Sequence, residues 1–169
     1  MSKPTLADNP EEIEQHLLRV AVRYLSYRPR FTAEVRLKLF QEFRRLNLDS
    51  NPLLVDKVIN RLVDERFLND QLLASDYALS QFKHRVKGPL YISAKLQKMG
   101  LEVSLINQIM AQQLPYRQQQ LAVRLLLKRR FGSKPANIQE VAKASRFLLS
   151  RGFEGELVRR VIDEWTQKA

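Results

Sequence analysis

The chain of 169 residues contains no cysteine, and this absence excludes disulfide frameworks, thiol nucleophiles and cysteine-based metal sites. It also lacks an apolar run long enough to span a membrane. The first residues have neither the basic start nor the continuous apolar stretch of a signal peptide. We therefore expect a cytoplasmic protein without a membrane partner.

Residue types that carry catalysis are also scarce. The two histidines, His16 and His84, lie far apart and have no carboxylate at metal-ligand spacing. Adjacent acidic residues, as at 64–65 and 163–164, point in different directions on a helix and do not converge on one substrate atom. The five glycines form no phosphate-binding loop. We expect no metal ion, no cofactor and no enzymatic activity.

Positive charge, by contrast, is abundant and unevenly placed. The chain has 29 Lys and Arg against 18 Asp and Glu, which gives a net charge of +11. Residues 115–169 carry +7 of this excess, whereas residues 1–69 and 70–114 carry +2 each. Such a concentration favours an anionic partner, either nucleic acid or an acidic protein surface, over a role in solubility alone.

The sequence also contains an internal repeat. Residues 96–110 (LQKMGLEVSLINQIM) match residues 148–162 (LLSRGFEGELVRRVI) position for position at an offset of 52. In both segments a glycine, Gly100 or Gly152, follows one apolar-periodic run and precedes another. The pattern predicts a helix that ends at a left-handed glycine, followed by a new helix. A chance likeness between two helix hairpins is the alternative, but a period of this length is typical of helical arrays.

Helix start signals divide the chain into three units. Helices are predicted to begin at the capping residues Asn9, Thr32, Asn51 and Asn69 and at Pro115. No segment shows the alternation of a strand. The predicted fold is all-α, with three tandem three-helix repeats at residues 1–68, 69–114 and 115–169 that form an elongated array.

Apolar residues at helical spacing predict the buried face of each helix. In the first repeat these residues are Ile13, Leu17, Val20, Tyr24, Val35, Leu39, Phe43, Leu54, Val58, Leu62 and Val63. In the first helix of the third repeat they are Leu121, Leu125 and Leu126.

Clustered basic residues are the candidate binding site. Each can neutralise a phosphate or meet an acidic side chain, and arginine can do so with two parallel hydrogen bonds. No set of side chains identifies a recognition helix, so we expect any contact with single- or double-stranded DNA to be weak and not sequence-specific. The candidates are Arg28, Arg30, Lys83, Arg85, Lys87, Arg117, Arg124, Lys128, Arg129, Arg130, Arg146 and Arg151.

Several short motifs follow one another along the chain. They are residues 27–30 (YRPR), 67–70 (FLND), 87–89 (KGP), 128–132 (KRRFG) and 147–153 (FLLSRGF). Together they resemble the motifs of the RecX regulatory family over nearly the whole chain. Two departures affect the first half: Asn69-Asp70 stands where that family has an acidic pair, and no Gly-Phe follows Leu39.

This resemblance implies a regulator that binds the RecA recombinase filament. Such a protein inhibits or modulates the recombinase, ATPase and co-protease activities of RecA in DNA repair and the SOS response. We expect it to act as a monomer whose repeats contact several protomers, because many weak contacts give avidity. The alternative is a DNA-binding module of tandem helix hairpins, acting as a transcription or architectural factor. That module would bind bare duplex tightly, with a steep salt dependence.

Overall fold

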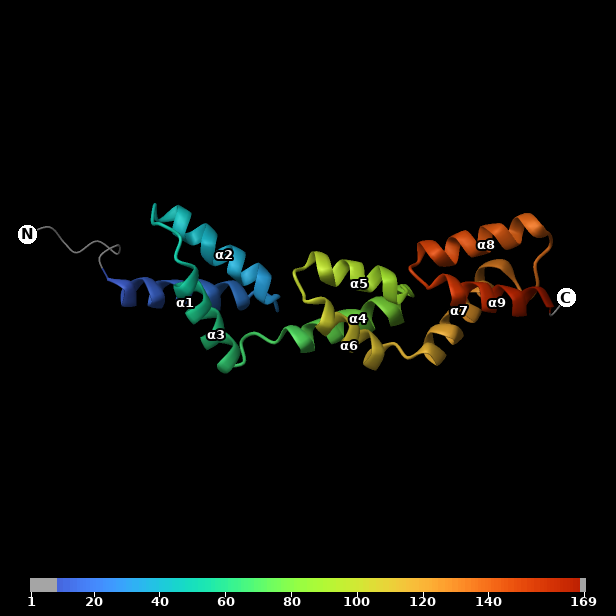
Figure 1. Ribbon diagram of the computed structural model, residues 1–169, viewed down its shortest axis with the longest axis horizontal. Helices are drawn as coiled ribbons and strands as arrows, with labels where there is room; N and C mark the ends of the chain where they lie inside the picture. Colours follow the sequence, from blue (N-terminus) through green and yellow to red (C-terminus); the bar gives the residue numbers. More distant parts are fainter. Residues whose placement is uncertain (1–8, 168–169) are drawn as a thin grey trace, which may run out of the picture. The chain divides into compact units, whose positions relative to one another are not determined.

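The computed structural model describes residues 9–167, and over this range the chain forms nine α-helices and no strand (Figure 1). The predicted all-α fold is confirmed. None of the helices in these residues combines the length and apolar character that a membrane span requires. The chain divides into two compact units, an N-terminal unit that ends at Leu73 and a C-terminal unit that begins at Ala74.

The N-terminal unit contains α1 (Pro10–Leu25), α2 (Thr32–Arg45) and α3 (Pro52–Asp64). Side-chain caps begin two of these helices, because Asn9 Oδ1 accepts from the Glu11 N–H and Asn51 Oδ1 accepts from the Leu54 N–H, both at 3.1 Å. Proline at the first helical position follows each cap, as the sequence predicts.

The predicted cap at Thr32 is wrong. Phe31 is the capping residue of α2, and its N–H donates to Glu34 Oε2 at 3.1 Å. The carboxylate of Glu34, the third helical residue, thus accepts from the backbone of the capping residue. The phenylalanine side chain itself has no polar group that could cap the helix. Thr32 is already helical, and its N–H donates to Asp70 Oδ1 at 2.8 Å. This contact, within the N-terminal unit, links the first residue of α2 to Asp70, the first residue of α4 (Asp70–Arg85).

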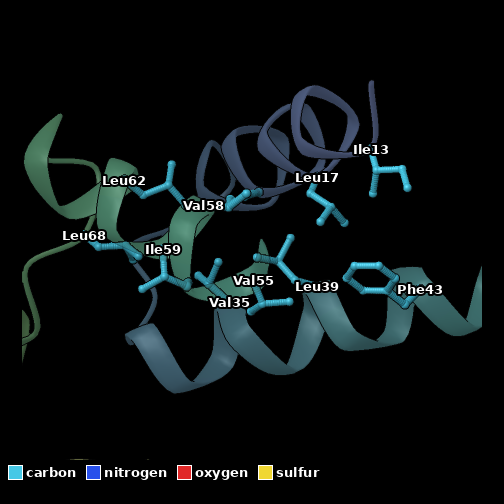
Figure 2. Close-up of a cluster of buried hydrophobic side chains, with 11 residues drawn as sticks. Ile13, Leu17, Val35, Leu39, Phe43, Val55, Val58, Ile59, Leu62 and Leu68 are labelled. Atoms are coloured by element: carbon cyan, nitrogen blue, oxygen red, sulfur yellow. The ribbon is translucent and has the colours of Figure 1, made fainter. Parts of the chain in front are cut away.

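One apolar core holds α1, α2 and α3 together (Figure 2). Leu17, Leu39 and Leu62 come from the three different helices, and each is fully buried. Burial of one such side chain contributes about 1.5–3 kcal/mol. Val63, predicted to join this core, is instead 46% exposed, because α3 turns Val55, Val58, Ile59 and Leu62 inward.

The C-terminal unit comprises most of α4 together with α5 (Pro89–Lys98), α6 (Val103–Gln113), α7 (Tyr116–Phe131), α8 (Ile138–Ser150) and α9 (Gly155–Gln167). Gly100 and Gly152 follow α5 and α8 with φ of 88° and 86°. The predicted left-handed glycines at the two helix ends are therefore confirmed.

The predicted buried face of α7 is wrong. Leu121 and Leu125 are 57% and 66% exposed, while Val123 and Leu127 are buried. Helix α7 has apolar side chains on two stripes, so the sequence pattern does not decide which stripe faces the other helices. Packing against α8 and α9 selects the Val123 stripe and leaves the two leucines in solvent.

Two glycines join the α4–α5 turn to the α8–α9 turn. The Gly88 N–H donates to the Arg151 carbonyl at 2.8 Å, and the Leu90 N–H donates to the Gly152 carbonyl at 3.0 Å. A Cβ atom on Gly88 would lie 2.3 Å from the Gly152 carbonyl oxygen. A Cβ atom on Gly152 would lie 2.5 Å from the backbone nitrogen of Tyr91. The backbones approach so closely that only glycine fits at either position.

Candidate anion-binding site

The two candidate arginines of the N-terminal unit, Arg28 and Arg30, form ion pairs with a carboxylate of the same unit. Both pair with Glu34 Oε1, at 2.8 Å and 3.3 Å, and the Arg30 guanidinium lies 4.2 Å from the centre of the Tyr24 ring. Burial acts against the charge of Glu34, but hydrogen bonds from the Phe31 N–H and Arg28 keep the pKa of this carboxyl below its ordinary value. These arginines therefore stabilise the turn between α1 and α2.

Arg124 is also paired. Its Nε and Nη2 atoms donate to Glu164 Oε2 at 3.0 Å and 2.7 Å, an ion pair that links α7 to α9. The pair neutralises the charge of Arg124 locally, so this side chain offers less to an external anion than its position in the sequence suggests.

Other candidates meet where the turns before α5 and after α8 come together. Arg151 Nη1 donates to the Arg85 carbonyl at 2.7 Å, which joins residues 66 positions apart. The Arg151 guanidinium lies 5.0 Å from the centre of the Phe147 ring, and the Arg130 guanidinium lies 4.3 Å from the same centre. One aromatic ring thus orients two arginines from α7 and the end of α8.

The ring of Tyr91 orients two lysines in the same way. Lys87 Nζ and Lys95 Nζ lie 4.2 Å and 5.8 Å from the centre of the Tyr91 ring, and the backbone of Tyr91 lies close to Gly152. Val86, just before Lys87, has φ of 48°, a conformation that costs a β-branched residue roughly 1–2 kcal/mol. The surrounding turn therefore holds this segment in a conformation that valine does not prefer.

We call these residues the junction cluster. It consists of Lys87 and Lys95 at the ring of Tyr91, Arg130 and Arg151 at the ring of Phe147, and Arg85, whose backbone carbonyl accepts from Arg151. None of its five cationic side chains forms an ion pair within residues 9–167. Guanidinium groups stacked on a ring keep their N–H donors at the edge, where a phosphate or carboxylate can accept from them.

The remaining candidates have exposed side chains. They are Lys83, Arg117, Lys128, Arg129 and Arg146, and the only hydrogen bond found for their charged groups in the described residues runs from Arg146 Nε to the Ala142 carbonyl. In the same part of the chain, no group of three or more His, Asp or Glu side chains could hold a metal ion. The arrangement is thus suited to electrostatic recognition of an anion.

Sequence reasoning missed three members of the cluster, namely Tyr91, Lys95 and Phe147. A local signal was present in each case. Tyr91 lies four residues before Lys95 on α5, and Phe147 lies four residues before Arg151, the spacing at which helical side chains meet. Lys87 lies outside the helix, four residues before Tyr91. Cations spaced in this way around an aromatic residue point to a stacked pair.

The chain is similar in sequence to a family model and to several named proteins. A family model described as "RecX, third three-helix domain" matches residues 117–162. A protein named "Regulatory protein RecX" from Listeria innocua is 27% identical over 89% of this chain and 54% of its own length. Its namesake from Deinococcus radiodurans is 30% identical over 96% of this chain and 74% of its own length. The chain spans about half the length of the Listeria relatives.

Solved structures agree with this comparison. The crystal structure of RecX from Lactobacillus salivarius matches 92% of this chain and 97% of its own, with a TM-score of 0.77 and 25% identity. A second structure, described as that of regulatory protein RecX, has a TM-score of 0.72 at 20% identity and shares the fold. Because the similarity to the Deinococcus protein covers 96% of this chain and 74% of that protein at 30% identity, the chain belongs to the RecX family.

Proposed function

We propose that this chain is a regulator that binds the RecA filament and restrains its recombinase, ATPase and co-protease activities. Family membership supports a regulatory role. The observation that carries the proposal is the charge of the C-terminal unit, which holds 17 basic and 7 acidic side chains. In its described residues only Arg124 and Arg160 form ion pairs, so most of the positive charge faces outward.

The junction cluster would supply the strongest anion contacts. Its arginines and lysines are oriented in advance by Phe147 and Tyr91, so binding orders fewer flexible side chains. A filament of protein on DNA presents both carboxylates and phosphates. Lys128 and Arg129 would extend the contact along α7. Each exposed charge adds only about 0.2–1 kcal/mol, so affinity would depend on several contacts made together.

Co-sedimentation with RecA-coated single-stranded DNA tests the proposal. We expect the chain to bind the coated DNA in preference to the same DNA without RecA, and to slow the DNA-dependent ATP hydrolysis of RecA. Changing Lys128→Glu, Arg129→Glu and Arg130→Glu together should weaken both effects while circular dichroism stays helical. Equal binding to coated and bare DNA with unchanged ATP hydrolysis would contradict the proposal.

The second candidate function is a DNA-binding module. The combination of aromatic rings with cations in the junction cluster favours it, because such surfaces also bind nucleic acid. This function predicts tight binding to bare duplex DNA whose affinity falls steeply with added salt. The same titration, run on bare duplex at two salt concentrations, separates the two functions.

A further inference from the structure

A pocket with a volume of about 260 Å³ lies between α7 and α9, apart from the junction cluster. Leu127, Val161 and Trp165 form its apolar wall. Trp165 Nε1 donates to the Gly132 carbonyl at 3.1 Å, so the indole offers only its ring to a ligand. Gly132 and Ser133 also line the pocket, and both are exposed, so they mark its opening to solvent. The pocket is therefore suited to an apolar side chain.

The charged residues that line the pocket differ in whether they form an ion pair. Arg124 and Glu164 neutralise one another there, at 2.7 Å. Lys128 also lines the pocket, and no ion pair is found for it in residues 9–167. The net local charge is positive, so an acidic group on the ligand would be favoured beside the apolar wall.

Two exposed leucines continue the apolar surface along α7. Leu121 and Leu125 are 57% and 66% exposed and lie one helical turn apart. Leu125 is three residues before Lys128, so the same side of the helix leads to the pocket. Single exposed leucines are ordinary on a protein surface, but a pair next to an apolar pocket marks an interaction surface.

The chemistry of this surface selects a protein ligand. Helix α7 contains no acidic residue, and Arg117, Lys128 and Arg129 are exposed along it. A nucleic acid backbone would satisfy these charges but would leave the leucines and the apolar pocket uncovered. An amphipathic segment with leucine-like anchors and acidic neighbours satisfies both.

We propose that α7 and the α7–α9 pocket form a docking site for an acidic amphipathic segment of a partner protein. One apolar side chain of the segment occupies the pocket beside Trp165, others cover Leu121 and Leu125, and carboxylates pair with Lys128 and Arg129. The identification of the partner with a RecA protomer rests on the proposed function.

A unique thiol tests occupancy of the pocket. Because the chain has no cysteine, Ser133→Cys at the opening can be labelled with an environment-sensitive dye, and Ser80→Cys on α4 is the matched control. RecA-coated single-stranded DNA should change the emission of the dye at position 133 and leave that at position 80 unchanged. Fluorescence anisotropy of labelled DNA reports filament binding separately, so loss of the proposed function is distinguished from failure of the docking site.

A second variant removes an apolar contact without affecting the core. Leu125→Ser should weaken filament binding about 5- to 30-fold, whereas Leu53→Ser, 81% exposed on α3, should bind like the wild type. Filament binding without a dye response at position 133, or a Leu125→Ser variant of wild-type affinity, would overturn the docking site. An equal dye response to bare single-stranded DNA would assign the surface to nucleic acid and overturn it as well.

Discussion

The two units of the chain use positive charge in opposite ways. The N-terminal unit has 12 basic and 11 acidic side chains, and six of its arginines and lysines form ion pairs within the described residues. The C-terminal unit has 17 basic and 7 acidic side chains, and within its residues up to 167 only Arg124 and Arg160 are found in ion pairs. Charge stabilises the first unit and is available for binding on the second.

The units also differ in how their helices are held together. Three helices around one apolar core make the first unit (Figure 2). In the same unit Arg45 donates to the buried carboxylate of Glu42, which lies 2.7 Å from His16 Nε2. In the second unit a backbone contact between Gly88 and Gly152 joins segments 64 residues apart. This contact also places Tyr91 next to Gly152, the residue after Arg151, so stability and the junction cluster depend on the same glycines.

The largest expected effect comes from Gly152→Ala. The added Cβ would lie 2.5 Å from backbone and side-chain atoms of Tyr91, at a φ of 86°. The clash and the left-handed backbone together should cost about 2–5 kcal/mol. Trp165 is the only tryptophan, so a thermal melt followed by its fluorescence reports the C-terminal unit.

Substitutions at two other glycines separate the effect of the steric clash from that of the left-handed backbone. Gly132→Ala adds a Cβ in open space at a φ of 82°, so it should cost only about 1–2 kcal/mol. Gly155→Ala meets no neighbouring atom and has no left-handed φ, so its melt should match the wild type or lie slightly above it. Equal melts for the Gly152 and Gly155 variants would show that the glycine contact does not hold this unit together.

The next effect concerns Glu42 in the N-terminal unit. Hydrogen bonds from Arg45 lower the pKa of this buried carboxyl to about 2, against an opposing effect of burial, and His16 contributes to the lowering. Glu42→Gln should cost about 1.5–3 kcal/mol at neutral pH, because it removes a charge-assisted partner from both residues. Circular dichroism melts measure this loss, with Asp49→Asn on the exposed surface as control.

The sign of the pH effect follows from the lowered pKa. The stabilisation by Glu42 is present above its ordinary pKa of 4.5 and is lost as the pH falls through about 2. The difference in stability between wild type and Glu42→Gln should therefore shrink as the pH falls from 5 to 2. A difference that stays constant over this range would mean that the charge of Glu42 does not stabilise the unit.

The smallest effect compares a paired with an unpaired arginine. Arg28→Gln removes an ion pair with Glu34 and should lower the stability of the N-terminal unit by about 0.2–1 kcal/mol. Arg129→Gln removes a charge for which no ion pair is found in the described residues, and it should leave stability unchanged. Denaturant titrations resolve this difference, and a larger loss for Arg129→Gln would reverse the comparison between the units.

Local signals in the sequence predict much of the fold. Asn9 and Asn51 cap helices as predicted, and Gly100 and Gly152 end helices in the left-handed conformation. These features depend on a few neighbouring residues, so the sequence contains them directly. The division into three repeats that begin at residues 1, 69 and 115 stays a prediction. The elongated shape also stays a prediction, and small-angle scattering can test it.

Features that depend on distant contacts were not predictable in the same way. Leucines on two stripes of α7 leave its buried face undecided until α8 and α9 pack on it, so the sequence alone wrongly predicts Leu125 to be buried. Among the basic residues, the sequence reveals the charge of each side chain but not its partner. Which of them are paired, as Arg124 is with Glu164 forty residues away, depends on the tertiary structure.

Filament binding by matched charge variants tests the central claim most directly. Lys87→Glu with Arg130→Glu reverses two charges of the junction cluster, and Arg19→Glu with Arg23→Glu reverses two exposed charges on α1 with the same change in net charge. Titration of RecA-coated single-stranded DNA should show clearly weakened binding for the first pair and wild-type binding for the second. An equal loss of binding in both variants would mean that net charge alone determines the interaction. Unchanged binding by the first variant would contradict a role for the junction cluster.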